Sequence, residues 1–175
     1  PGQGFFVAAR SSSFANITFK EAMQTTSTAD DFFEGDVFQF NEVELRLSNG
    51  DNYVGKTNIF FIEGLSNGLD IGWDAGSYSQ NASIMSRMIE EDEGHGMAIN
   101  AMGLDAMEST VIPLVINQPA GQEFKVSLFT ATIPDTNVYL EDNVLGTFTN
   151  LYEQDYVHTS DAVSYTHLTL PTMFE

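Results

Sequence analysis

The sequence predicts an all-β fold, an antiparallel two-sheet β-sandwich of the jelly-roll or immunoglobulin-like kind with little helix. Three observations predict it. Apolar residues alternate with polar ones at a period of two rather than 3.6. Clusters of turn-forming residues recur at short intervals, as they do in sandwiches and barrels. With 175 residues, 42% of them hydrophobic, the chain is long enough to bury one core without disulfides or a metal ion.

The clearest predicted strand contains Val43, Leu45 and Leu47, which alternate with polar residues. It ends at the dipeptide Asn49-Gly50, which suits the positive φ of a tight hairpin. Residues 57–64 follow and read as a more fully buried strand. This part of the chain therefore predicts a β-hairpin with one face on the core.

The same alternation predicts two further half-buried strands, one before and one after this hairpin. Their inward-facing residues are Ile17 and Phe19 in the first strand, and Phe124, Val126 and Leu128 in the second. The only helical candidates, residues 28–34 and 77–87, carry no clear apolar stripe. Five of the seven methionines fall between residues 85 and 107, where we expect them to fill gaps in the core.

Four carboxylates crowd against a histidine in the segment "EEDEGH", residues 90–95. The flanking runs 83–90 and 96–103 read as strands, and Gly94 and Gly96 supply the permissive backbone of a bend between them. Neither a His-Glu-x-x-His helix nor a Cys/His spacing is present to converge ligands on an ion. We therefore interpret the segment as a solvated hairpin, and an ion site that includes His95 is the alternative.

The loop "SNGLDIGWDAG", residues 66–76, places Asp70 and Asp74 four residues apart among glycines. Carboxylates in an irregular loop are ligands that calcium prefers, although the full calcium-loop pattern is absent. The alternative is that both aspartates cap turns by accepting hydrogen bonds from backbone N–H groups. Trp73, between them, either packs against the sheet or forms a platform for a sugar. Calcium is the only cofactor that the sequence suggests.

The charge balance excludes two classes of partner. The chain has 25 acidic and 6 basic residues, a net charge of -19. Nucleic acid and anionic membrane surfaces repel such a chain. No apolar run approaches the roughly 20 residues of a membrane span, so we expect no membrane insertion. Cysteine is absent, and so are the G-x-S-x-G elbow and the phosphate-binding loop, so the chain is not expected to be an enzyme.

Several separated motifs resemble a known family. They are "PGQGFFVAA", "NITFKEAMQTT", "VELRLSNGDN", "GLSNGLDIGWDAG", "VIPLVI" and "VYLEDNVLGTFTNL". They occur in the same order in the β-sandwich regions near the C-termini of secreted cargo proteins of the type IX secretion system, and the resemblance covers about residues 1–160. It implies a secreted or surface-attached β-rich module that is normally followed by a short sorting domain, and it implies no catalytic residues.

The end of the chain departs from that family, because the expected closing strand with its Arg-Phe pair is missing. The stretch "VSYTHL", Val163–Leu168, resembles instead the translation of a transposon-end adaptor used in preparing sequencing libraries. We therefore expect one sandwich domain over residues 1–162, a fragment of a larger protein. Residues 163–175 would then be a non-native tail that lies at an exposed edge and contributes little stability. The alternative is a genuine strand, since Thr and Tyr suit strands.

The sequence predicts a non-catalytic structural or adhesive module of a larger secreted or cell-surface protein. Its expected partners are the neighbouring domains of the same chain and a glycan or cell-surface matrix. A glycan-binding module that uses Trp73 and the loop with Asp70 and Asp74 is the alternative. A glycosidase with a pair of carboxylates comes third, because in a chain with 25 acidic residues some pair always exists.

Overall fold

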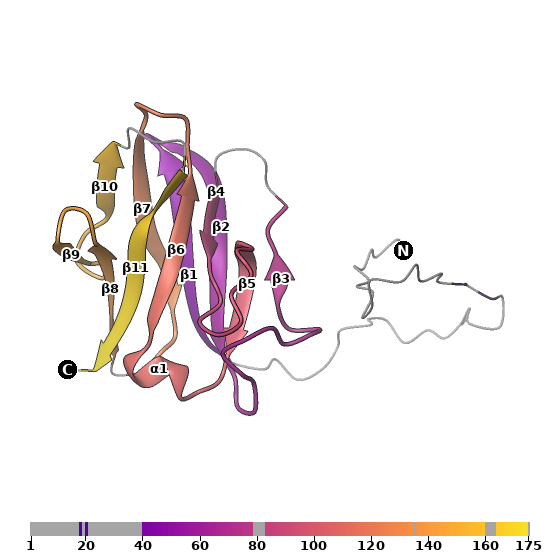
Figure 1. Ribbon diagram of the computed structural model, residues 1–175. Coiled ribbons are helices and arrows are strands. Elements are labelled where there is room, and N and C mark those ends of the chain that lie inside the picture. The colour runs from indigo at the N-terminus through magenta and orange to yellow at the C-terminus, as the bar shows by residue number, and fades with distance from the viewer. Residues whose placement is uncertain are drawn as a thin grey trace, which may run out of the picture. The chain divides into compact units, whose positions relative to one another are not determined.

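The computed structural model describes residues 18, 20, 40–78, 83–134, 136–159 and 164–174 (Figure 1). The chain divides into two units, Pro1–Phe38 and Gln39–Glu175, and the fold below is that of the second unit. The predicted inward residues Ile17 and Phe19 and the helical candidate at 28–34 lie outside the described residues.

The second unit is built almost wholly of β-strands. They are β1 (Asn41–Asn49), β2 (Asn52–Phe61), β3 (Ala75–Gly76), β4 (Ser83–Ser86), β5 (Met97–Met102), β6 (Val111–Asn117), β7 (Glu123–Ala131), β8 (Thr136–Asp142), β9 (Thr147–Asn150), β10 (Tyr156–Thr159) and β11 (Ser164–Phe174). One short helix, α1 (Ala106–Ser109), completes the described elements. The prediction of an all-β fold with little helix is confirmed. None of the helices in the described ranges has the length and hydropathy that crossing a membrane requires.

The strands form a single sheet in the order β10-β7-β1-β2-β5-β4-β6-β11-β8-β9, with β3 added beside β5. All described pairings are antiparallel except that of β2 with β5. The sheet curls into a nearly closed barrel, and Tyr156 on β10 donates a hydrogen bond to Asp142 on β8, near the two ends of the strand order. The predicted division into two sheets is therefore not observed. Alternation specifies which face of a strand is buried, but not where a hydrogen-bonded path breaks.

The hydrophobic core lies inside this curled sheet. Fully buried residues come from strands throughout the path: Val43, Leu45, Leu47, Ile59, Phe61, Ile84, Met102, Ile112, Leu114, Ile116, Phe124, Val126, Val138, Leu140, Leu168 and Leu170. Leu128 is half-buried and packs against this cluster. Four of the five methionines between residues 85 and 107 are also buried: Met85, Met88, Met97 and Met102. The predicted inward residues of the described strands and the predicted role of the methionines are confirmed.

The hairpin predicted at Asn49-Gly50 joins β1 to β2. Asn49 pairs with Asn52, so the two loop residues are Gly50 and Asp51, and Gly50 has φ of +56°. Positive φ costs glycine little, which explains its place in this tight loop. The hairpin is confirmed, with its turn one residue later than the dipeptide indicated.

Two expectations for other elements are wrong. The helical candidate at 77–87 contains β4 instead, as the reading of 83–90 as a strand predicts, because Ile84 and Met85 pair with β6 inside the sheet. The tail was expected at an exposed edge, yet β11 lies between β6 and β8 and pairs with both. Leu168 and Leu170 on β11 are fully buried. The alternating residues of this segment thus form a strand in the interior of the sheet rather than at its edge.

Candidate functional site

The loop that follows β2 carries Trp73 and is shaped by two carboxylates. Asp70 Oδ2 accepts hydrogen bonds from the backbone N of Ser66 at 2.7 Å and from its hydroxyl at 2.9 Å. The backbone N of Asp70 donates in turn to Asp74 Oδ2 at 2.6 Å. Side chains that bond nearby backbone groups hold irregular loops in one conformation. We call residues 66–74 the Trp73 loop.

Asp74 also ties this loop to the sheet. Its Oδ1 accepts a hydrogen bond from the backbone N of Ala101 on β5 at 2.7 Å. Burial raises the pKa of Asp74 above its ordinary value, since loss of water disfavours the charged form. Both aspartates therefore accept backbone hydrogen bonds, as the turn-capping alternative requires. Within the described ranges, no group of three or more His, Cys, Asp or Glu residues could hold a metal ion. Calcium at Asp70 and Asp74 stays a prediction.

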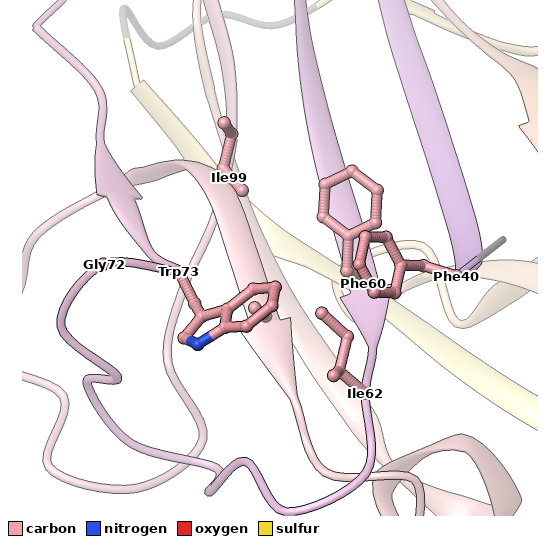
Figure 2. A pocket seen from close by; sticks show the side chains of 7 residues that line it. Phe40, Phe60, Ile62, Gly72, Trp73 and Ile99 are labelled. Carbon is pink, nitrogen blue, oxygen red and sulfur yellow. The ribbon is translucent and has the colours of Figure 1, made fainter. Parts of the chain in front are cut away.

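Trp73 lies over an open apolar pocket of about 170 Å³ on the face of the sheet opposite the core (Figure 2). The pocket is lined by side chains from segments far apart in the sequence: Phe40, Phe60, Ile62, Trp73, Ile99 and Ala101, with Gly72 at its edge. Phe60 on β2 and Ala101 on β5 are register partners in the parallel pair. The pocket thus forms where the Trp73 loop folds over the junction of β2 and β5.

Three aromatic rings define the walls of this pocket. The Phe40 and Trp73 rings are 5.9 Å apart between centroids and nearly perpendicular, at 89°. The Phe40 and Phe60 rings are 6.0 Å apart at 76°. We call Phe40, Phe60 and Trp73 the aromatic corner. The ring of Trp73 packs on Phe40. Because 46% of the Trp73 surface remains exposed, the indole is also accessible to a ligand.

Large hydrophobic side chains project from the same loop. Leu69 is 54% exposed and Ile71 is 61% exposed, at alternate positions that lead to Trp73. Leaving such side chains in water is unfavourable, and clustered exposed apolar groups mark contact sites. The Trp73 loop therefore exposes apolar side chains, and the hydrogen bonds of Asp70 and Asp74 fix its backbone conformation.

The acidic segment 90–95 is exposed, as the solvated interpretation predicts. Arg87 Nη2 and Nε contact Asp92 Oδ2 at 2.8 and 2.9 Å, and these hydrogen bonds hold the pKa of Asp92 below its ordinary value. The segment is a longer loop than the predicted hairpin, because β4 ends at Ser86 and pairs with β5 only at Ser86 and Met97. His95 is exposed within it and belongs to no metal-binding group of the described chain.

The acidic segment contacts the Trp73 loop, which the sequence did not reveal. The backbone N of Glu90 donates to the carbonyl of Asn67 at 3.0 Å. The acidic segment thus borders the Trp73 loop at Asn67.

Basic residues of the second unit are engaged by carboxylates. Lys56 and Arg46 contact Glu44 at 2.8 and 2.7 Å, Arg87 contacts Asp92, and Lys125 contacts Asp155 at 3.3 Å. Residues 40–175 contain no other Lys or Arg. Each basic side chain of this unit therefore has an acidic partner.

The chain matches the model of one protein family over residues 1–167, the Domain of unknown function (DUF8693). The chain belongs to the DUF8693 family. Searches of curated proteins and of solved structures each found no match.

The DUF8693 match spans the whole candidate site, including every residue that lines the pocket. It ends inside β11, before the buried residues Leu168 and Leu170. The family description names no secretion system, so the resemblance to type IX cargo proteins stays a prediction.

Sequence reasoning identified Trp73, Asp70 and Asp74 but missed the rest of the pocket. Phe40, Phe60 and Ile99 come from three separate segments, and nothing local marks them as neighbours. The one available signal was the outward phase of Phe60, between the inward residues Ile59 and Phe61.

Proposed function

We propose that the chain is a non-catalytic adhesive module of a larger secreted or cell-surface protein, and that the Trp73 loop is its contact surface. The observation that carries the proposal is the exposure of Leu69, Ile71 and Trp73 on a loop that Asp70 and Asp74 hold in place. Contacts made by such side chains bury apolar surface, which is the main favourable term in most protein association.

The held backbone supports adhesion because a preorganised loop loses little conformational freedom when it binds. The Ala101–Asp74 hydrogen bond connects the loop directly to β5, inside the sheet. A force applied at the loop would thus pass into a continuous hydrogen-bonded sheet. The net charge of -19 disfavours nucleic acid and anionic membranes as the contacted surface.

Bead adhesion tests this proposal. Beads that carry the full chain would be applied to surfaces coated with a neutral polysaccharide or with a matrix protein, and the detachment force would be measured. We expect the double variant Ile71→Ser, Trp73→Ala to lower the detachment force severalfold on the surface that binds.

The matched control is Val144→Ser, Phe148→Ala, which changes two other exposed apolar residues, 60% and 56% accessible, on the β8–β9 turn and strand β9. The control variant should detach like the unmodified chain. Equal adhesion of the Trp73 variant, or no adhesion to any coated surface, would contradict the proposal.

Glycan binding through Trp73 is the second candidate function, and the open pocket beside the indole favours it. Aromatic faces contact the apolar side of sugar rings. Asp70 and Asp74 would act by shaping the loop, because their carboxylates already accept backbone hydrogen bonds. Saturable binding on a glycan array that Trp73→Ala abolishes would support this candidate. Turnover of a polysaccharide would instead support the third, a carboxylate-pair glycosidase.

A further inference from the structure

We infer that the pocket at the aromatic corner binds a quaternary ammonium group, such as the trimethylammonium group of choline. The inference rests on the proposed function in that it assigns a ligand to the same Trp73 surface. Figure 2 shows Trp73 on one side of the pocket and Phe40 and Phe60 on the other.

The geometry of the rings suits a cation. An organic cation is attracted to the face of an aromatic ring when it lies within about 6 Å of the ring centroid, and Trp gives the strongest attraction. Phe40 is nearly perpendicular to both Trp73 and Phe60, with centroid separations of 5.9 and 6.0 Å. A group in the angle between these rings can therefore lie within reach of more than one ring.

The remaining lining selects a methylated cation over an ordinary ammonium. Ile62, Ile99 and Ala101 present no side-chain hydrogen-bond acceptor to the pocket. An ammonium with N–H groups would lose hydrogen bonds to water there without replacement, which is costly. A quaternary ammonium has no N–H group and carries an apolar methyl surface. The pocket volume of about 170 Å³ is below that of sites for drug-sized ligands, so it suits a small group.

Charge around the pocket also favours a cation. Glu42 on β1 is the register partner of Phe60, so both side chains lie on the same face of the sheet. Its carboxylate accepts a hydrogen bond from the neutral amide of Asn58 and forms no ion pair with another described residue. Every Lys and Arg of this unit is engaged elsewhere by a carboxylate. The surroundings therefore attract a positive ligand and repel an anion.

Trp73 is the single tryptophan of the chain, so its fluorescence reports on the pocket directly. The probe is choline chloride, and the matched neutral probe is 3,3-dimethylbutanol, which has the same shape without the charge. We expect a saturable fluorescence change with choline and binding of the neutral probe weaker by about tenfold, which corresponds to about 1.4 kcal/mol. Sodium chloride at equal ionic strength should give no saturable change. Equal affinity for both probes, or no saturable change with choline, would overturn the inference.

Substitutions locate the effect. Phe40→Leu and Phe60→Leu each remove a ring but keep an apolar side chain, so choline affinity should fall severalfold while affinity for the neutral probe hardly changes. Glu42→Gln perturbs no core residue and should lower choline affinity a few fold, which keeps the test valid if a ring variant fails to fold. Phe148→Leu, at an exposed aromatic residue outside the pocket, is the control and should bind like the unmodified chain. Unchanged choline affinity in the folded Leu variants and in Glu42→Gln would overturn the inference.

Vesicles distinguish a free solute from a headgroup as the source of the cation. Phosphatidylcholine vesicles display a trimethylammonium group, and phosphatidylethanolamine-containing vesicles display an ammonium with N–H groups. Binding to the first and not the second would assign a headgroup, and binding of free choline alone would assign a solute. Adhesion of beads without choline binding would contradict only this inference, whereas choline binding without adhesion would contradict only the proposed function.

Discussion

Glu44 shows how a single residue can couple stability to pH on the outer face of the sheet. Its side chain is 8% exposed and accepts hydrogen bonds from Lys56, Arg46 and Asn58. Burial alone would raise the pKa of Glu44, but these hydrogen bonds outweigh burial and hold the pKa below the ordinary value of 4.5. The folded state therefore binds a proton less readily than the unfolded state.

The resulting stability is present above pH 4.5 and is lost as pH falls through the lowered pKa of Glu44. We expect Glu44→Gln to lower the free energy of unfolding at pH 7 by about 1 to 2 kcal/mol, a modest value because Arg46 and Lys56 are partly exposed. The deficit should shrink in acid. Urea unfolding at pH 7 and pH 3.5 measures it, with the exposed Glu153→Gln as control. A deficit that is the same at both pH values would argue against this role.

Gly103 precedes α1 at a position where backbone crowds the space of a side chain. A Cβ atom added there would lie 2.8 Å from the carbonyl oxygen of Leu65, closer than real contacts allow, and would also meet the Asp105 carboxylate. We expect Gly103→Ala to destabilise the protein by about 1 to 3 kcal/mol through this overlap. Gly68→Ala, where the nearest atoms would be 3.7 Å away, is the matched control and should cost less. Thermal unfolding measures both variants. Equal melting temperatures for Gly103→Ala and Gly68→Ala would contradict the predicted crowding at Gly103.

The competing interpretations of Asp70 differ in one measurable respect. A calcium site would raise the melting temperature in millimolar calcium by mass action, and Asp70→Asn would abolish that rise. Turn capping instead predicts the same melting curve with calcium and with chelator. It also predicts a loss of about 0.5 to 2 kcal/mol in Asp70→Asn under both conditions. The hydrogen bonds from Ser66 lead us to expect the second result.

At the scale of elements, alternation predicted strands well where each side chain faces either core or water. Val43, Leu45 and Leu47 in β1 and Phe124 and Val126 in β7 follow this pattern. The pattern was ambiguous at β4, which lies both in the predicted strand 83–90 and in the helical candidate 77–87, because its four residues are all buried and full burial removes the polar phase of the alternation. The same limit hid the parallel pairing of β2 with β5, which depends on partners 41 residues apart in sequence, such as Asn58 and Ile99, rather than on local residue types.

Strand β11 has only a short, weak alternation of apolar and polar residues, yet it lies between two other strands of the sheet. Leu168 and Leu170 are fully buried between β6 and β8. We expect Leu168→Ala to cost about 2 to 5 kcal/mol, the usual range for a buried leucine, and deletion of residues 164–175 to cost at least as much. Leu145→Ala, 55% exposed, is the control. A deletion that left the urea midpoint unchanged would show that β11 contributes nothing to the core.

The origin of residues 163–175 is a separate question that stays a prediction. Reading the genomic locus answers it. A coding sequence that continues through Val163 without an adaptor boundary would contradict the expectation of a non-native tail.

The site was predicted less completely than the fold, because most residues of the pocket come from segments that only the tertiary structure brings together. Trp73 and its flanking aspartates lie in one contiguous loop, so the sequence could single them out. The aromatic corner exists only because the sheet brings Phe40 and Phe60 beneath that loop. Similarly, the pairing of every basic residue in the second unit follows from tertiary contacts and not from the charge count.

Across the whole molecule, the second unit has a buried apolar interior, the chain has a strong excess of acidic residues, and the Trp73 loop exposes apolar side chains. The interior explains how the chain folds without disulfides. The exterior repels anionic surfaces. The Trp73 loop is an exposed apolar part of the described surface, and covering Leu69, Ile71 and Trp73 would be favourable.

Protection of Trp73 on attachment would show that the Trp73 loop is the contact surface. Acrylamide quenching of the single tryptophan would be measured for the free protein and for the protein attached to the coated surface that retains it. The account predicts that attachment lowers the quenching constant severalfold, because the indole, 46% exposed in the free protein, becomes covered. A quenching constant that attachment leaves unchanged would show that adhesion uses another face, and would contradict the account.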